Sequence, residues 1–125
     1  MEVKKKKIMI VDDAPVIHSL LKNILKKVNY RIEIIDAFSA QEAIDKFNSE
    51  RPDIIFMDII MEKHLSGVDV LKYIKKQNPE IPVIMVTSLR ANDDVIKECV
   101  DAGADQYISK PFNNQDILSS LDPHL

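Results

Sequence analysis

The chain has 125 residues, 46% of them hydrophobic and 30% charged, which suits one globular domain and excludes a disordered or collagen-like chain. Its 17 Lys and Arg residues oppose 20 Asp and Glu residues, and this net charge of -3 argues against direct nucleic-acid binding. The single Cys99 cannot form an internal disulfide and no apolar run is long enough to cross a membrane, so we expect a single cytoplasmic domain, residues 1–125, without membrane contact.

The first strand and the first helix are predicted from the N-terminal quarter of the chain. The apolar run 8–11 suits a strand buried on both faces. The apolar side chains of segment 17–28 share one helical face, while His18 falls on the opposite, polar face. Asp13 is placed to cap the start of this helix, and Pro15 suits its first turn, where no backbone donor is needed.

The remaining elements alternate in the same way. Further apolar runs predict strands at 32–37, 54–57, 83–86 and 106–109. Amphipathic segments predict a helix that starts at Ser39, helices over 67–77 and 92–102, and a last helix from about Asn114. Ser39 and Glu42 have the spacing of a capping box, and Gly103 is placed to end a helix in the left-handed conformation.

This order of elements predicts the fold class. Strand and helix alternate five times, which is typical of a parallel sheet joined by right-handed crossovers and covered by helices on both faces. We therefore expect an α/β fold with a doubly wound, five-stranded parallel sheet in a three-layer sandwich.

Polar side chains follow four of the five predicted strands, at the point where each strand ends. They are Asp12 and Asp13 after the first strand, Asp58 after the third, Thr87 after the fourth and Lys110 after the fifth. In doubly wound sheets, ligands bind beyond the carboxyl ends of the strands, where the strand order reverses. We expect these side chains to converge on one site.

The chemistry of this set favours phosphoryl transfer with a metal. Three crowded carboxylates repel one another and raise the pKa of at least one of them, and Mg²⁺ relieves this repulsion because it prefers carboxylate, phosphate and water oxygens. Lys110 adds a fixed positive charge and Thr87 a hydroxyl donor, as phosphoryl transfer requires. Taken singly, each Asp has an ordinary structural interpretation, and for Asp13 alone a helix cap is the better one. The complete set favours the chemical interpretation.

Five short motifs carry a resemblance to a known family. They are Val11-Asp12-Asp13 with Pro15, Met57-Asp58, Val86-Thr87-Ser88, Ala102-Gly103-Ala104-Asp105 with Tyr107, and Lys110-Pro111-Phe112. In this order and approximate spacing, the chain resembles the CheY-like receiver domain of two-component response regulators over essentially its whole length. The resemblance implies a flavodoxin-like (βα)5 fold with strand order 2-1-3-4-5.

The resemblance also implies roles for the acidic residues. Asp58 is the phospho-acceptor, which takes a phosphoryl group from a phosphohistidine of a sensor histidine kinase or a histidine phosphotransfer protein. Asp13 and Asp58 bind Mg²⁺ directly, and Asp12 binds it through water. The backbone carbonyl of Ile60 completes the protein ligands.

Three further roles follow from the resemblance. Lys110 pairs with a phosphoryl oxygen, and its bond to Pro111 is cis. Thr87 moves toward the phosphoryl group and Tyr107 turns inward behind it, although a structural tyrosine is an equal alternative for Tyr107 taken alone. This movement changes the face formed by the fourth helix, the last strand and the last helix, which an unknown downstream effector or a phosphorylation-dependent homodimer would use. Such a protein is no general enzyme, because it catalyses only its own phosphorylation and dephosphorylation.

The segment after the acceptor departs from the family pattern. Glu62 stands where the family usually has a proline, and Gly67 comes one residue late, so the loop 61–67 is one residue longer. Ile60 and Leu89, which flank the acceptor site, are aliphatic and cannot hold a water for attack on the phosphoryl group. We therefore expect slow self-dephosphorylation.

Three other functions remain open from the sequence. A phosphatase of the haloacid dehalogenase type normally has Asp-x-Asp after the first strand, whereas Asp12 and Asp13 are adjacent. A flavodoxin-like flavin binder needs a phosphate-cradling loop, for which the chain offers only Gly67 and Gly103. A phosphorylation-independent receiver-like interaction module would not respond to Mg²⁺ and a phosphodonor.

Overall fold

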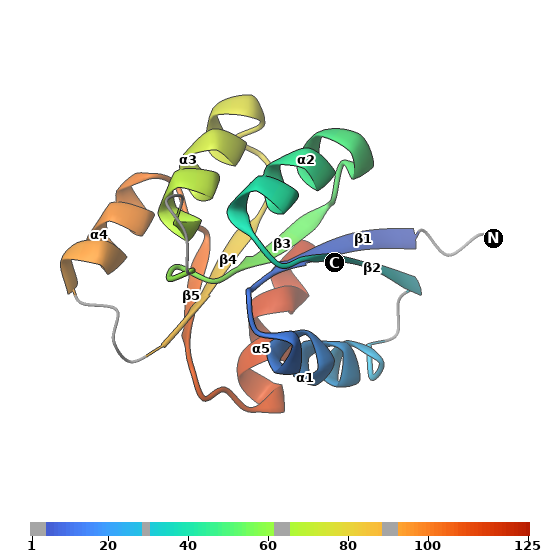
Figure 1. The fold of residues 1–125 in the computed structure, drawn as a ribbon. Helices are drawn as coiled ribbons and strands as arrows, with labels where there is room; N and C mark the ends of the chain where they lie inside the picture. The colour runs from blue at the N-terminus through green and yellow to red at the C-terminus, as the bar shows by residue number, and fades with distance from the viewer. Residues whose placement is uncertain (1–4, 29–30, 62–65, 89–92) are drawn as a thin grey trace.

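Strands and helices alternate along the chain in the computed structural model, which describes residues 5–28, 31–61, 66–88 and 93–125 (Figure 1). None of the helices in these ranges is long and apolar enough to cross a membrane. The elements are β1 (Lys5–Val11), α1 (Pro15–Leu25), β2 (Arg31–Ala37), α2 (Ala40–Glu50), β3 (Ile54–Met57), α3 (Gly67–Gln77), β4 (Val83–Thr87), α4 (Asp93–Asp101), β5 (Gln106–Ser109), α5 (Asn114–Leu121) and a 3₁₀ turn, Asp122–His124.

The strands form one parallel sheet in the order β2-β1-β3-β4-β5. Helices α1 and α5 cover one face of it, and α2, α3 and α4 cover the other (Figure 1). This arrangement confirms the predicted doubly wound, flavodoxin-like sandwich. The chain passes from β1 to β2 on one side and then crosses back to β3 on the other side of β1. The strand order therefore reverses beside β1, and the carboxyl ends of β1 and β3 flank the crevice where such sheets bind ligands.

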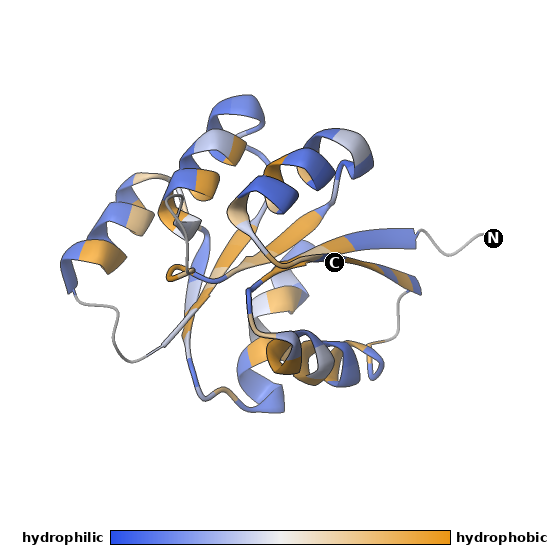
Figure 2. Ribbon diagram, viewed as in Figure 1, coloured by the Kyte–Doolittle hydropathy of each residue, from blue (hydrophilic) through white to orange (hydrophobic). Residues whose placement is uncertain are grey.

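Alternate residues of the central strands serve the two layers of helices. In β1, Met9 and Val11 pack in the cluster under α2 and α3, whereas Ile8 and Ile10 pack against α1 and α5. Every residue of β3 and β4 is buried, and Figure 2 shows these strands as the apolar centre of the molecule. Burial on both faces is the physical reason why these strands are continuous apolar runs in the sequence.

Most of the predicted boundaries are confirmed. Strands β3 and β5 and helix α3 have the predicted limits, and α5 begins at Asn114 as expected. Gly103 has a φ of 100°, so it ends the α4 segment in the backbone region that favours glycine. The predictions for Glu62, Leu89 and Asn92 lie outside the described residues.

The start of the first helix differs from the predicted cap, whereas the predicted cap of the second helix is confirmed in part. Ala14 occupies the cap position of α1 without a side-chain hydrogen bond, so the interpretation of Asp13 as a helix cap is wrong. The Ala14 N–H instead donates to Asp12 Oδ1 at 2.8 Å. Ser39 does cap α2, since its hydroxyl accepts from the Glu42 N–H at 3.1 Å. The Glu42 carboxylate pairs with a lysine one turn later, and the second half of the capping box is replaced by this ion pair.

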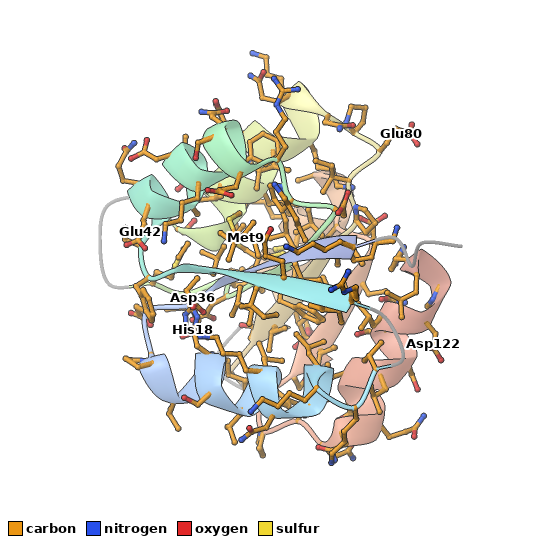
Figure 3. All side chains as sticks on the ribbon, turned by 90° about the vertical axis from the view of Figure 1, so that its right-hand side faces the viewer. Met9, His18, Asp36, Glu42, Glu80 and Asp122 are labelled. Atoms are coloured by element: carbon orange, nitrogen blue, oxygen red, sulfur yellow. The ribbon has the colours of Figure 1, made fainter. Side chains whose placement is uncertain are left out.

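The buried face of α1 includes a histidine that the sequence assigns to solvent. His18 is 2% exposed, so the prediction that it lies on the polar face is wrong, and Leu20 is about half exposed instead. The imidazole lies between α1 and the end of β2, beside Asp36 (Figure 3), and its ring stacks on Phe38 with the ring centroids 4.1 Å apart. A histidine is buried without great cost where both ring nitrogens find partners, and apolar periodicity alone carries no information about such partners.

Candidate functional site

Three carboxylates meet at the carboxyl ends of β1 and β3. One oxygen from each of Asp12, Asp13 and Asp58 lies within 4.8 Å of the other two. Asp12 and Asp58 are almost fully buried and Asp13 is half-buried. The parallel sheet is responsible for this meeting, because β1 and β3 are paired neighbours and Val11 stands opposite Met57 in the register. The predicted convergence of the acidic residues is confirmed.

Each polar group of Asp12 is hydrogen bonded. Its N–H donates to the Ala37 carbonyl at 3.1 Å, and its carbonyl accepts from His18 Nε2 at 2.8 Å. Its carboxylate accepts from the Ala14 N–H at 2.8 Å through Oδ1 and from Lys110 Nζ at 2.7 Å through Oδ2. By contrast, no hydrogen bond or ion pair holds the Asp13 carboxylate within the ranges that the structure describes. Asp12 is therefore fixed in place, and Asp13 is free to bind a ligand.

Lys110 follows the edge strand β5 and brings a positive charge to the carboxylates. Its Nζ lies 2.7 Å from Asp12 Oδ2 and 3.5 Å from Asp58 Oδ2. The backbone positions it, because the Lys110 N–H donates to the Thr87 carbonyl at 2.6 Å, and the Lys110–Pro111 bond is cis, as the resemblance implies. One ammonium opposes three carboxylates, so the site keeps an excess of negative charge.

Asp58 shows the electrostatic consequence of this crowding. Burial raises its pKa from 3.8 to about 6, and repulsion from Asp12 and, less strongly, Asp13 acts in the same direction. The charge of Lys110 and the N–H of Ile60, which donates to Asp58 Oδ1 at 3.3 Å, lower the pKa without cancelling the rise. Ionisation of Asp58 therefore costs free energy in the metal-free folded protein, and an added cation would reduce this cost.

The donor set fits a hard divalent cation. It consists of clustered carboxylate oxygens with one unengaged carboxylate, and it contains no sulfur or imidazole atom among the described residues that form it. All-oxygen donor sets of this kind suit Mg²⁺, which retains some of its waters. The structure therefore supports a site that could bind a metal ion.

The two residues expected to form the switch lie on neighbouring strands. Thr87 ends β4, and its buried Oγ1 has no hydrogen-bond partner in the described part of the chain. Tyr107, on β5, is 39% exposed, and its phenol oxygen accepts a hydrogen bond from the Ser109 hydroxyl at 3.3 Å. In this structure the tyrosine therefore faces outward.

The loop after Asp58 is constrained by a glycine whose importance the sequence did not reveal. A Cβ atom on Gly67 would lie 1.8 Å from the carbonyl oxygen of Asp58. The Gly67 N–H also donates to the Ile59 carbonyl at 2.9 Å, so the first residue of α3 lies against the acceptor's own backbone. In the sequence, Gly67 is notable only because it is one of two glycines and comes one residue later than in the family. The Ile60 side chain is 49% exposed beside the acceptor.

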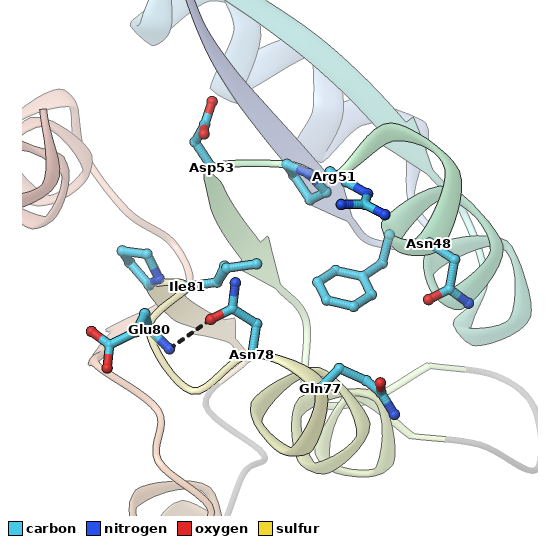
Figure 4. A pocket seen from close by; sticks show the side chains of 10 residues that line it. Asn48, Arg51, Asp53, Gln77, Asn78, Glu80 and Ile81 are labelled. Atoms are coloured by element: carbon cyan, nitrogen blue, oxygen red, sulfur yellow. Dashed lines mark hydrogen bonds between the residues drawn. The ribbon is translucent and has the colours of Figure 1, made fainter.

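The hollow drawn in Figure 4 lies at the other end of the sheet. It measures about 470 Å³, and its walls come from the C-terminal ends of α2 and α3 and from the segments that precede β3 and β4. It is lined by Phe47, Asn48, Arg51, Pro52, Asp53, Gln77, Asn78, Glu80, Ile81 and Pro82. None of the sequence-predicted site residues lines it. The cluster of three carboxylates therefore lies at the opposite end of the sheet from this hollow.

Comparisons with known proteins agree with the family indicated by the motifs. The family model described as "Response regulator receiver domain" matches residues 8–122. The chemotaxis protein CheY of Thermotoga maritima is 34% identical over 117 residues, which are 94% of this chain and 95% of that protein. A probable transcriptional regulator, ycf27, of Cyanophora paradoxa is 36% identical over 97% of this chain but only 48% of its own length, so the chain spans about half of that relative.

A solved structure agrees with the fold as well. The CheY-like response regulator receiver domain protein from Methanospirillum hungatei JF-1 superposes with a TM-score of 0.85 at 33% identity. The match covers 96% of this chain and 93% of that chain. Family and fold therefore agree over the same residues that build the acidic site.

Proposed function

Because the chain belongs to the family of response regulator receiver domains, we propose that it is a switch whose Asp58 accepts a phosphoryl group from a phosphohistidine. The observation that carries this proposal is the buried Asp58 carboxylate, whose pKa is raised to about 6 between two other carboxylates and the ammonium of Lys110. Crowded carboxylates favour a bound cation, and a lysine beside them offers a partner for phosphoryl oxygens.

In the proposed reaction, a carboxylate oxygen of Asp58 attacks the phosphorus atom of the phosphohistidine. An O–P bond forms to give an acyl phosphate, the N–P bond breaks, and the released imidazole nitrogen keeps the electron pair and takes a proton from water. Lys110, with its Nζ 3.5 Å from Asp58 Oδ2, would pair with one phosphoryl oxygen. Thr87, whose hydroxyl has no partner among the described residues, would donate to another.

We further propose that Asp13 and Asp58 bind Mg²⁺ directly, that Asp12 binds it through water, and that the backbone carbonyl of Ile60 completes the protein ligands. The Asp13 carboxylate, which has no partner among the described residues, and the hydrogen-bonded carboxylate of Asp12 support this division of roles. When bound, the cation would neutralise the negative charge of the carboxylates and of the phosphoryl oxygens.

Phosphorylation would be transmitted through Thr87 and Tyr107. If Thr87 moves toward the phosphoryl group, Tyr107 can leave its outward position and turn inward, which would change the α4-β5-α5 face. A downstream effector or a phosphorylation-dependent homodimer would recognise that face. In this proposal the chain is a signalling switch in the cytoplasm that catalyses only its own phosphorylation and slow dephosphorylation.

The proposed phosphodonor is a sensor histidine kinase or a histidine phosphotransfer protein. The family supports this class of partner, because receiver domains of response regulators take part in two-component signalling. Direct nucleic-acid binding by residues 1–125 is not proposed, in view of the net charge of -3.

Mass spectrometry of the intact protein tests the proposal. We expect Mg²⁺ and acetyl phosphate together to add the mass of one phosphoryl group, and we expect the Asp58→Asn variant to remain unmodified under the same conditions. Omission of Mg²⁺ is the second control. A wild-type chain that stays unmodified, and whose amide spectrum does not respond to beryllofluoride, would instead be a phosphorylation-independent interaction module.

A further inference from the structure

A buried imidazole connects the acidic site to the neighbouring strand. His18, on α1, is 2% exposed. Its Nε2 lies 2.8 Å from the carbonyl oxygen of Asp12, and its Nδ1 lies 2.7 Å from Asp36 Oδ1. The ring therefore links the end of β1, which carries the acid pair, to Asp36 on β2, which Figure 3 shows beside it.

The chemistry of the two partners determines the direction of these hydrogen bonds. A backbone carbonyl can only accept, so His18 Nε2 carries a hydrogen and donates it to Asp12. Asp36 is held ionised: burial would raise its pKa, but hydrogen bonds from Lys22 and His18 outweigh this and lower it. Its Oδ2 accepts from Lys22 Nζ at 2.7 Å, and its backbone carbonyl accepts from Lys46 Nζ. The imidazole is thus attached to a fixed support.

The position of the Asp12 carbonyl matters because it belongs to the peptide that joins Asp12 to Asp13. Rotation of this peptide plane changes ψ of Asp12 and φ of Asp13, and the second angle sets the direction in which the Asp13 side chain leaves the backbone. Within the described ranges the Asp13 carboxylate has no hydrogen bond of its own. The backbone is therefore the main restraint on its direction, and His18 holds that backbone.

We propose that His18 is a positioning residue for the acidic site, which directs the Asp13 carboxylate toward Asp58 by holding the Asp12 carbonyl. This inference rests on the proposed Mg²⁺-dependent phosphorylation of Asp58. His18 touches neither the phosphoryl group nor the cation in this arrangement. Its effect is on the affinity for the cation, because a direct ligand that points away from its productive direction binds weakly.

A matched pair of substitutions separates positioning from ordinary burial. The amide nitrogen of Gln reaches about as far as Nε2 of His, and that of Asn about as far as Nδ1. His18→Gln can therefore still donate to the Asp12 carbonyl, whereas His18→Asn can donate only toward Asp36. Both variants are polar and both remove the stack on Phe38, so a role in packing alone would affect them similarly.

The measurement is the Mg²⁺ dissociation constant by calorimetry, together with the free energy of unfolding in urea. We expect His18→Asn to weaken Mg²⁺ binding about tenfold, as loss of a residue that orients a metal ligand does. His18→Gln should stay within about threefold of the wild type for the same reason. In single-turnover phosphorylation at subsaturating Mg²⁺, His18→Asn should be slower than the wild type, and saturating Mg²⁺ should restore most of the rate.

The proposal is overturned if both variants bind Mg²⁺ as the wild type does, or if both lose affinity equally in proportion to their loss of stability. If His18→Asn does not fold, Asp36→Ala is tested in its place, because it removes the partner of His18 Nδ1. An unchanged Mg²⁺ affinity of Asp36→Ala then refutes the positioning role of His18. A wild-type chain that neither binds Mg²⁺ nor becomes phosphorylated on Asp58 refutes the proposed function itself, which distinguishes the two failures.

Discussion

Replacement of Asp58 by Asn should stabilise the metal-free protein at neutral pH. The folded protein forces Asp58 to ionise at a pKa of about 6, whereas the same group in the unfolded chain ionises near 3.8. Below the lower value both states are protonated and the group costs nothing. Between about pH 4 and pH 6 the unfolded chain releases its proton first, so the wild-type protein loses stability as the pH rises, and above the folded pKa the loss is constant.

The size of the effect follows from the pKa values. One pKa unit corresponds to about 1.4 kcal/mol, so a rise from 3.8 to about 6 amounts to about 3 kcal/mol. The Asp58 side chain is only 7% exposed, so water screens it little. Asn keeps the acceptor for the Ile60 N–H and removes the charge next to Asp12. We therefore expect the free energy of unfolding of Asp58→Asn to exceed that of the wild type by roughly 2–3 kcal/mol above pH 7.

Urea unfolding of both proteins between about pH 4 and pH 8 tests this prediction. The difference should be small near pH 4, grow up to about pH 6 and stay level above it, and added Mg²⁺ should reduce it by stabilising the wild type. Asp36→Asn is the matched control of opposite sign. The pKa of Asp36 is lowered in the folded protein, so its replacement should destabilise above about pH 4 and matter less at lower pH. If Asp58→Asn and the wild type have the same free energy of unfolding, or if their difference does not depend on pH, the electrostatic argument is refuted.

Three further predictions concern residues around Asp58. Gly67→Ala places a Cβ 1.8 Å from the Asp58 carbonyl oxygen and should cost about 3 kcal/mol or more in thermal unfolding. Gly103→Ala, whose Cβ would meet only the Lys75 side chain at ordinary contact distance but at a φ of 100°, should cost only about 1–2 kcal/mol; equal melting temperatures would contradict this. Thr87→Val should change the free energy of unfolding by less than about 1 kcal/mol, because the hydroxyl has no partner in the described structure, yet it should abolish the change in the amide spectrum that phosphorylation causes. Ile60→Asn should speed the loss of the phosphoryl group by up to about 100-fold, since a polar side chain there can hold the attacking water; label lost from the wild type within seconds, and no faster from the variant, would show that Ile60 does not limit the reaction.

The sequence predicted the architecture because burial on two faces leaves a signal in consecutive residues. Apolar runs such as 54–57 and 83–86 are typical of strands buried on both faces, and helices between them favour parallel pairing. The rule that ligands bind at the carboxyl ends of strands then predicts that Asp12, Asp13, Asp58 and Lys110 lie together, and their proximity in the structure agrees with it.

Tertiary structure alone decided how these residues are held. Nothing in the order of residues shows that Asp12 is fully hydrogen bonded while the Asp13 carboxylate has no partner among the described residues. The partners of Asp12 come from Ala14 and α1, from β2 and from the segment after β5. The helical pattern places His18 toward solvent because it distinguishes only apolar from polar side chains, and it cannot represent a buried polar ring whose two nitrogens both have partners. The sequence by itself therefore determined the fold and the composition of the site. The packing of distant segments determined the charge balance and the restraint on each carboxylate, since hydrogen bonds and pKa values depend on distances that only the folded chain sets.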